Sequence, residues 1–544
     1  MYNKRTAPRP SLPALLSMLV LVALLVAACG GTQEPGQPTA PVMGTPGGTE
    51  TPMDADTPLG TRPPGAFEDI REGVLRVTAF PIAQTDPALI SSDAEVLIAS
   101  QVYDYLVDVD ANNEIQPRLA TDWTEGEDGL TYTFSLAEGV TFHDGSPFSA
   151  EDVVWTFDRL RDPDSGYPTA DLYQNIVEVE ATGDLEVTFT LSETNPFFLY
   201  DLSDNHALIM KAGTEDPTDW NGTGPFVVTV YQPESRIVMQ ANESYFVEGQ
   251  PRLEELQILF FSEQSAAADA VRGGQADLTM DLSTPLYESL SAQPELEPSD
   301  IATNQFAVVR LRTDQPPGDD PRVVQAFKLA TDLDAIFQLV QQGYGAVGRN
   351  TPIGPVYEEY YTEDVPIPPR DPEAARELLA EAGYADGLEI DLNLLDTLNF
   401  PDLAVVLKEQ WAEAGITANV VTLPESVYYG ENQWLEVPLG ITGWGHRPYP
   451  QFYLDVMLTC DAIWNEARFC DPEFDRLVAI AGSSLDEQER VDAYHEIQRI
   501  LIEDGPIIVP YFFAEYAVIR DGFDGFELHP FSGRTDLRRV GVAP

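Results

Sequence analysis

Alternating apolar and polar residues mark several short strands along the chain. A period of two places one side of a strand on a core and the other side in a more polar environment. This pattern predicts strands over residues 73–80, 185–191 and 253–261. It also predicts two strands over residues 226–242, joined by the turn Gln232–Ser235.

Apolar residues at helical spacing lie between and after these strands. The clearest case is 371–384, where Asp371 is a good N-cap, Pro372 suits the first turn and Gly383 ends the helix. Further helices are expected over 95–110 with an extended exit, over 265–280 with a stop at Gly273 and Gly274 and then a strand entry, over 320–340 as a pair, and over 401–416 and 486–505. Strands are expected over 388–395 and 417–423, and an extended apolar segment over 506–519. Strand–helix–strand alternation predicts an α/β sheet with right-handed crossovers.

The stretch 130–157 predicts two strands, a turn and the start of a helix. Ser149 is a suitable N-cap, and Asp152 three residues later forms a short version of the capping box. His143 lies in the predicted turn with no partner Ser, Cys or carboxylate cluster nearby in sequence, so we interpret it as structural rather than as a general base.

The N-terminal segment has the pattern of an export signal. Lys4, Arg5 and Arg9 precede an apolar run, Leu12–Cys29, that ends in small residues. The sequence "VAAC" before Gly30 resembles the lipobox of bacterial lipoproteins, which implies that Cys29 is acylated and becomes the mature N-terminus. Residues 1–29 are therefore expected to be a lipoprotein signal peptide. The Pro-, Gly- and Thr-rich residues 30–65 are expected to form a disordered tether.

The charge of the chain excludes one class of partner. The 544 residues include 90 Asp and Glu against 30 Lys and Arg, a formal net charge of -60. Such a surface repels the phosphates of nucleic acids. No nucleic-acid partner is expected.

Once Cys29 is used for acylation, Cys460 and Cys470 remain. An even pair of cysteines in an exported protein predicts a disulfide. The alternative, a metal site, needs further ligands nearby, and the five His of the chain are scattered. We expect no metal site and no cofactor.

Several of these segments together resemble the solute-binding proteins of bacterial peptide/nickel ABC importers, family 5. The resemblance covers about residues 66–542 and rests on segments such as "EGVTFHDGSPFSAEDVVWTF", "NGTGPFVV", "DPRVVQAFKLATDLDAI", "RDPEAARELLAEAGY" and "LKEQWAEAGI". It implies a two-lobed α/β fold of the class II periplasmic-binding-protein type, with an extra subdomain and lobes joined by hinge strands. Lobe I would comprise residues 66–303 plus 510–544, and lobe II residues 304–509. "NQFAVVRL" and "PIIVPYF" are the candidate hinge crossings.

The resemblance also implies a function. The chain would be a monomeric, non-enzymatic receptor that binds a peptide or other small oligomeric solute between its lobes. It would sit outside the cytoplasm, lipid-anchored to the outer face of the cell membrane or in the periplasm, and deliver the solute to a membrane permease. The sequence has no Walker motif, so the ATPase would be a separate chain.

The loop "GWGHRPYP" carries most of the expected ligand contacts. In peptide-binding relatives a Gly-Trp here is often followed by an Asp that pairs with the α-ammonium of the peptide. Gly443 and Trp444 match, but His446 and Arg447 stand where that Asp would be. A free α-amine on the ligand is therefore in doubt.

The loop offers other contacts instead. Arg447 offers a fork for a carboxylate, phosphate or sugar, and Trp444 and Tyr449 offer flat faces. His446 is a further candidate contact, and Asp455 is a possible substitute for the missing carboxylate.

Weaker candidates come from position in the family alone. Thr397 and Asn399 lie between a strand and the N-terminus of a helix, a natural place for polar ligand groups. Tyr103 follows the first helix. For these residues a packing role is at least as probable.

Alternatives remain open at this point. Within the family, the solute could be a nickel or metal chelate, supported by His446 alone, or an oligosaccharide. A secreted hydrolase would need a motif such as G-x-S-x-G or H-E-x-x-H, and neither occurs. A sensory lipoprotein of the same fold is also possible, because fold does not fix function.

Overall fold

The computed structural model describes residues 73–544, except 166, 168, 171 and 431–432. The predicted signal peptide, the predicted tether and Cys29 lie outside the described residues. Across the described part of the chain, no helix has both the length and the apolar character needed to cross a membrane.

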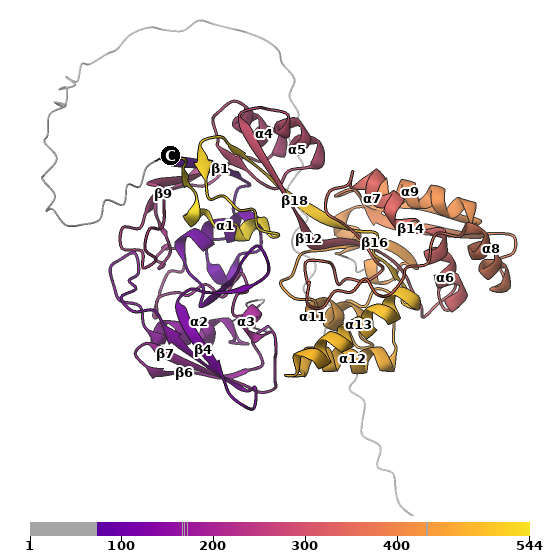
Figure 1. Ribbon diagram of the computed structural model, residues 1–544, viewed down its shortest axis with the longest axis horizontal. Coiled ribbons are helices and arrows are strands. Elements are labelled where there is room, and N and C mark those ends of the chain that lie inside the picture. Colours follow the sequence, from indigo (N-terminus) through magenta and orange to yellow (C-terminus); the bar gives the residue numbers. More distant parts are fainter. Residues whose placement is uncertain (1–72, 166, 168, 171, 431–432) are drawn as a thin grey trace, which may run out of the picture. The chain divides into compact units, whose positions relative to one another are not determined.

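One 12-stranded mixed sheet organises the chain (Figure 1). Its order is β15-β14-β16-β12-β18-β11-β1-β10-β9-β8, with β13 paired to β18 and β17 paired to β12. The strands are β1 (Val74–Ala79), β8 (Phe226–Gln232), β9 (Arg236–Ala241), β10 (Glu255–Phe260), β11 (Leu278–Thr279), β12 (Leu296–Leu311), β13 (Ala346–Val347), β14 (Leu388–Leu395), β15 (Ile416–Leu423), β16 (Leu439–Trp444), β17 (Ile507–Ile508) and β18 (Tyr511–Arg520).

Three smaller sheets stand apart from it. An antiparallel sheet has the order β4-β5-β7-β6, and two further sheets each pair two strands, β2 with β3 and β19 with β20. Their strands are β2 (Val107–Val109), β3 (Ile115–Pro117), β4 (Ala120–Glu125), β5 (Thr131–Leu136), β6 (Ile176–Gly183), β7 (Glu186–Leu191), β19 (Phe523–Asp524) and β20 (Gly541–Val542).

The helices include those predicted from the sequence and five that were not predicted, at 198–201, 284–291, 425–428, 451–453 and 472–483. In chain order the helices are α1 (Asp93–Val102), α2 (Ala150–Leu160), α3 (Phe198–Asp201), α4 (Gln264–Arg272), α5 (Thr284–Ser291), α6 (Pro321–Ala330), α7 (Leu333–Val340), α8 (Pro372–Glu381), α9 (Phe400–Glu413), α10 (Glu425–Tyr428), α11 (Gln451–Tyr453), α12 (Pro472–Ser483) and α13 (Glu487–Glu503). Asp371 caps α8 by accepting from the backbone N–H of Ala374, as predicted, and Gly383 just after it has φ +100°.

The stretch 130–157 corrects one prediction. β5 and α2 form as expected, and Ser149 and Asp152 make the predicted capping box. The second strand does not form, because residues 137–149 form only a single bridge, between Thr141 and Pro147. The His143 ring lies against the carbonyl oxygens of Trp220 and Gly224, which ties this turn to a neighbouring loop.

β12 and β18 are the long strands through which the two ends of the large sheet connect. β18 pairs antiparallel with residues 296–306 of β12, and β16 pairs with residues 306–311 of the same strand. A bulge between Ala302 and Phe306 interrupts the pairing with β18, and Phe306 pairs with both β18 and β16. The predicted first crossing, residues 304–311, is therefore the second half of a longer strand that begins at Leu296.

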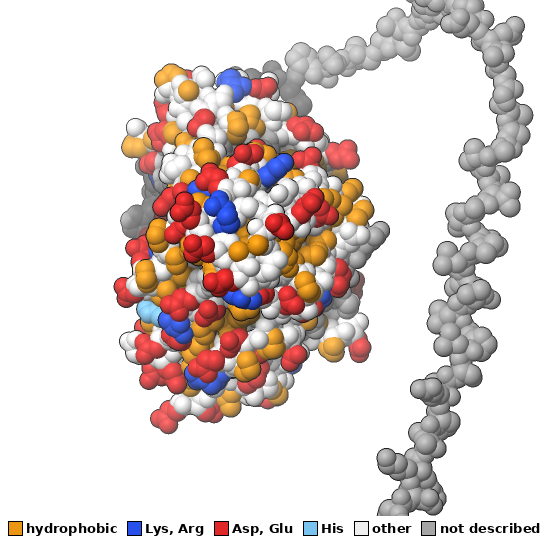
Figure 2. All heavy atoms as spheres, turned by 90° about the vertical axis from the view of Figure 1, so that its right-hand side faces the viewer, with side chains coloured by type: hydrophobic (Ala, Val, Ile, Leu, Met, Phe, Trp, Pro, Cys, Tyr) orange, Lys and Arg blue, Asp and Glu red, His pale blue; other side chains and the backbone are white. Residues whose placement is uncertain are grey.

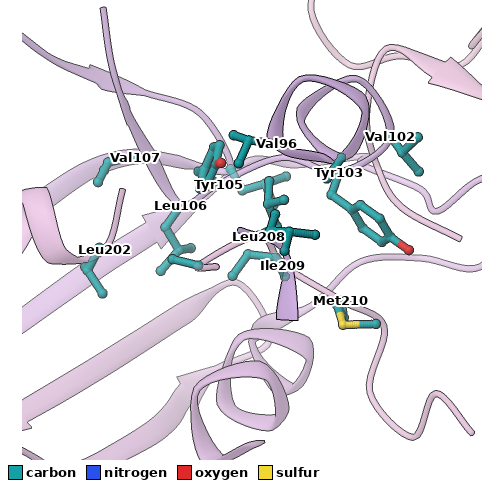
Figure 3. Packing of buried hydrophobic residues seen from close by; sticks show 14 of the residues in the cluster. Val96, Val102, Tyr103, Tyr105, Leu106, Val107, Leu202, Leu208, Ile209 and Met210 are labelled. Atoms are coloured by element: carbon teal, nitrogen blue, oxygen red, sulfur yellow. The ribbon is translucent and has the colours of Figure 1, made fainter. Parts of the chain in front are cut away.

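Four hydrophobic cores fill the molecule. One joins residues between 75 and 280 with residues 517–540 of the C-terminal segment, and part of it is shown in Figure 3. Another joins residues 307–441 with Ile508 and Tyr511. A third packs α12 and α13 against β12, and the last packs α4 and α5 near β18. The C-terminal segment thus returns to the first core, as the sequence predicts, whereas the exact lobe boundaries stay a prediction.

A disulfide joins Cys460 and Cys470, ten positions apart. A closed loop of this length stabilises the folded chain by about 3 kcal/mol in the chain-entropy treatment. The loop matters for the site below, because Glu466 lies within it.

Charged side chains are scattered among apolar and uncharged groups on the face shown in Figure 2. Carboxylates are spread over it, and the few Lys and Arg side chains lie singly among them. Many Arg side chains of the described chain are held in ion pairs, for example Arg499 with Glu496 and Arg312 with Glu436.

Candidate functional site

A pocket of about 390 Å³ lies where three neighbouring strands end. β14 runs parallel to both β15 and β16, so the carboxyl ends of these strands meet at one edge. Ligands of open α/β sheets bind at such edges. The pocket is lined by Gln305, Leu395, Asp396, Thr397, Leu398, Phe400, Leu423, Pro424, Glu425, Tyr429, Gly443 and Gly445.

The loop between β14 and α9 forms one wall. Thr397 lines the pocket, and its contact with a ligand stays a prediction. Asn399 precedes α9 but does not cap it with its side chain. Its Oδ1 instead accepts a hydrogen bond of 2.6 Å from the Tyr511 hydroxyl on β18, which anchors the loop.

The end of β16 turns Gly443, and not Trp444, toward the pocket. Gly443 and the following Gly445 line the pocket, whereas the half-buried Trp444 side chain packs against the core that contains α12 and α13. Trp444 Nε1 donates to Glu466 Oε1 at 3.1 Å, and its ring lies 6.0 Å from that of Trp464. Successive residues of a strand face opposite sides of the sheet, so this register places Trp444 away from the pocket. Contact between Trp444 and a ligand stays a prediction.

His446 is held as a neutral ring. Its Nδ1 accepts the backbone N–H of Asn304 at 3.0 Å. Burial, with smaller effects of His529 and Arg447, lowers the pKa of His446 to about 3. The neutral ring then carries its proton on Nε2. Within the described residues, no group of three or more His, Cys, Asp or Glu is placed to hold a metal ion.

Arg447 is exposed beside the pocket. A Cβ added to Gly445 would lie 3.6 Å from Arg447 Nη1, which places the guanidinium at the pocket edge. The guanidinium lies over the Phe452 ring at 4.6 Å, and Nη1 donates to the His446 carbonyl oxygen. Arg447 has no ion-pair partner in the part of the chain that the structure describes, and its remaining N–H groups are available to an anion.

Tyr449 is turned away from solvent by contacts with the segment before α3. Its ring stacks on that of Phe197 at 4.7 Å, and its hydroxyl donates to Asp201 Oδ1 at 2.7 Å. Asn113 Nδ2 also donates to the Pro448 carbonyl oxygen at 2.6 Å. One face of the Tyr449 ring is therefore occupied by Phe197 rather than open to a ligand.

Two other candidates lie elsewhere. Tyr103 is 1 % exposed and packs in the first core (Figure 3), where burial raises the pKa of its hydroxyl. The structure does not bring it together with the pocket residues. Asp455, the proposed substitute carboxylate, lies in a π-helical turn, Leu454–Leu458, and accepts from Gln451 Nε2 at 2.8 Å. It is not among the residues that line the pocket.

Several residues of the site were not predicted from the sequence. Leu398, Phe400, Leu423 and Tyr429 reach the pocket from three separate segments. Glu466 was also missed, although it lies between the two cysteines. No local pattern marks these residues, because strand register and chain crossing decide their positions.

Known proteins resemble the chain over most of its length. Residues 114–465 match the family model "Bacterial extracellular solute-binding proteins, family 5 Middle". Di/tripeptide-binding protein 1 of Pseudomonas aeruginosa is 29% identical over 84% of this chain and 92% of its own length. Heme-binding protein A of Haemophilus influenzae is 29% identical over 82% of this chain and 88% of its own. The solved structure of HbpA2 from Haemophilus parasuis superposes with a TM-score of 0.77 at 25% identity, covering 87% of this chain and all of that one.

The predicted two-lobed α/β fold is confirmed by this structural likeness. The family model spans well over half of the chain, including the strands that build the pocket. Members of the family are binding proteins, which fits a pocket at the carboxyl ends of neighbouring strands. The chain therefore belongs to family 5 of the bacterial extracellular solute-binding proteins.

Proposed function

We propose that this chain binds a short peptide and delivers it to the permease of an ABC importer. Its similarity to a di/tripeptide-binding protein supports a peptide as the solute. The pocket at the strand ends, with Arg447 at its edge, supplies the place and the charge for that solute. In this proposal the chain is a monomer with no catalytic role, and the ATPase is a separate chain.

The unpaired guanidinium of Arg447 is the single observation that carries the proposal. Like Arg236 and Arg376, Arg447 is exposed and has no ion-pair partner among the described residues, but of these three only Arg447 lies beside a residue that lines the pocket. A guanidinium binds a carboxylate through two parallel hydrogen bonds. We assign Arg447 to the α-carboxylate of the peptide.

The α-ammonium group needs an acidic partner, and none follows Trp444 in the loop. Asp396 and Glu425 both line the pocket and are exposed. In this proposal they take the role that an Asp of the loop would play and keep the ammonium beside a carboxylate. Asp455, the substitute considered from the sequence, does not line this pocket.

Peptide binding is tested with a double-mutant cycle on the purified full chain, unfolded and refolded without reducing agent to remove bound solute. Calorimetric titration with free-acid and C-terminally amidated tripeptides gives the dissociation constants. We expect Arg447→Ala to weaken binding of the free acid about 10- to 100-fold, the value of a charged hydrogen-bonded pair. Amidation of the peptide should weaken its binding to the wild-type chain by the same factor. It should not change the affinity of Arg447→Ala for the peptide.

Arg447→Lys is the matched control, because it keeps the charge and loses the fork. It should bind the free acid with intermediate affinity. Additive losses from Arg447→Ala and amidation would contradict the assignment of Arg447. Failure of the wild-type chain to bind any peptide would overturn the proposed solute.

We further propose that Cys29 is acylated and that residues 30–65 tether the binding domain to the membrane. Several acyl chains on one residue hold a soluble domain on a bilayer, whereas the described part of the chain has no membrane-crossing helix. Cys29→Ser should move the protein from the membrane fraction to the soluble fraction on cell fractionation. An unchanged membrane fraction would rule out the lipid anchor.

A further inference from the structure

Leu398 combines a left-handed backbone conformation with an exposed side chain. Its φ is +51°, in the left-handed region that glycine and asparagine adopt more readily, and its side chain is 56% exposed. Among the described residues, it is the one aliphatic side chain on a backbone with positive φ. Single exposed leucines are common on protein surfaces, but at a positive φ asparagine is less strained than leucine.

The strain is held in place by the surrounding loop. The backbone N–H of Phe400 donates to the Thr397 carbonyl oxygen at 3.3 Å, which closes a turn around Leu398. The next residue, Asn399, is fixed by Tyr511 at 2.6 Å. Strained backbone that is fixed in this way clusters at binding sites.

The side chain of Leu398 lies over the floor of the pocket. A Cβ added to Gly443 would lie 3.5 Å from Leu398 Cδ1 and 2.9 Å from Phe400 Cζ. Leu398 and Phe400 therefore converge above the bare backbone of Gly443. Leu423 and Pro424 add further apolar groups to the pocket lining, along with the polar side chains of Thr397, Gln305, Asp396 and Glu425.

We propose that Leu398 determines specificity by packing against an apolar side group of the solute inside this pocket. The solute is then a peptide with a large aliphatic or aromatic side chain, whose burial removes Leu398 from water. This inference rests on the proposed peptide-binding function. It explains why the loop keeps a leucine where the backbone favours another residue.

The experiment compares wild type with Leu398→Asn in the refolded full chain. Trialanine and the tripeptides that carry one Leu or Phe in place of Ala at each position are titrated calorimetrically. Wild type should prefer a Leu or Phe peptide over trialanine. Leu398→Asn should bind that peptide about 5- to 30-fold more weakly, as expected for loss of part of a buried leucine contact. Trialanine should bind both proteins equally within about twofold, since its methyl groups reach little of the apolar wall.

A stability measurement separates loss of contact from loss of fold. Asparagine adopts the left-handed conformation more readily than leucine, so the urea midpoint of Leu398→Asn should equal or exceed that of wild type. Leu339→Asn is the matched control, with the same substitution at a leucine that is 67% exposed on α7. Leu339→Asn should prefer the Leu or Phe peptide over trialanine as strongly as wild type does.

The outcomes distinguish the inference from the function on which it rests. Three results would overturn the role of Leu398 while peptide binding stands. They are a preference of Leu398→Asn for the Leu or Phe peptide as strong as that of wild type, no such preference in wild type, and a lower urea midpoint in Leu398→Asn. No binding of any peptide by wild type would overturn both.

Discussion

Replacing Glu466 by alanine will lower the free energy of unfolding by about 3–5 kcal/mol. Glu466 and Arg310 form an ion pair of 3.1 Å with side chains that are 1% and 0% exposed. Removing the carboxylate leaves a guanidinium buried without its counter-charge, and this costs far more than the ion pair itself is worth. Thr442 Oγ1 and Trp444 Nε1 lose their acceptor in the same step.

Urea unfolding followed by circular dichroism measures this loss. Glu496→Ala is the matched control, because it removes a carboxylate from an ion pair with Arg499 that is about 40% exposed on both sides. That change should cost at most about 1 kcal/mol. Glu466→Gln should fall between the two, since the amide oxygen still accepts hydrogen bonds. Equal losses for Glu466→Ala and Glu496→Ala would show that the pair is not buried in solution.

The change that Asp201→Asn makes in the free energy of unfolding will be more stabilising at pH 8 than at pH 4. The difference between the two pH values will be up to about 4 kcal/mol. Burial raises the pKa of Asp201 to about 7, opposed by hydrogen bonds from Tyr449 and Asn195 and reinforced by Asp204. The unfolded chain releases this proton near pH 4, whereas the folded chain holds it until about pH 7. The contribution of Asp201 to stability is therefore complete at low pH and is lost as the pH rises between these values. Asparagine cannot ionise and shows no such loss.

The difference in unfolding free energy between Asp201→Asn and wild type, measured in urea from pH 4 to pH 8, isolates this group from the other titrating residues. Tyr449→Phe is an informative control. It removes a donor to the ionised carboxylate and keeps the stack on Phe197, so the loss of stability should move to higher pH. A difference that does not vary with pH would show that Asp201 ionises as in the unfolded chain.

The two predictions concern the same part of the molecule. Glu466 holds the indole of Trp444 on one side of β16, and Asp201 holds the hydroxyl of Tyr449 at the end of the following loop. Both residues fix the loop that carries His446 and Arg447. Neither appears among the ligand contacts expected from the sequence.

Most helices and strands could be predicted from the sequence, because the signals that set them are local. Asp371, Pro372 and Gly383 define α8 within a dozen residues, and the alternation in 226–242 defines the β8–β9 hairpin. The second strand expected near Thr141 failed because a strand needs a partner along its length. That segment finds only one bridge, and it folds back as a turn.

The candidate site was predicted only in part. The sequence identified the two loops that build it, 396–399 and 443–449, and Arg447 at its edge. It could not show that Gly443 and Gly445 face the pocket while Trp444 faces a core, because β16 has buried residues on both sides and its periodicity does not reveal which side is which. It also could not reveal the left-handed backbone of Leu398.

Most of the elements, the family and the two loops beside the candidate pocket could be predicted from the sequence, since capping, periodicity and motif order are properties of neighbouring residues. Tertiary structure alone decided which side chains meet. Strand register set the direction of Trp444, burial changed the protonation of His446 and Asp201, and the contact with Tyr511 fixed the loop around Leu398. These outcomes depend on residues that are far apart in the chain and become neighbours only when the sheet has formed.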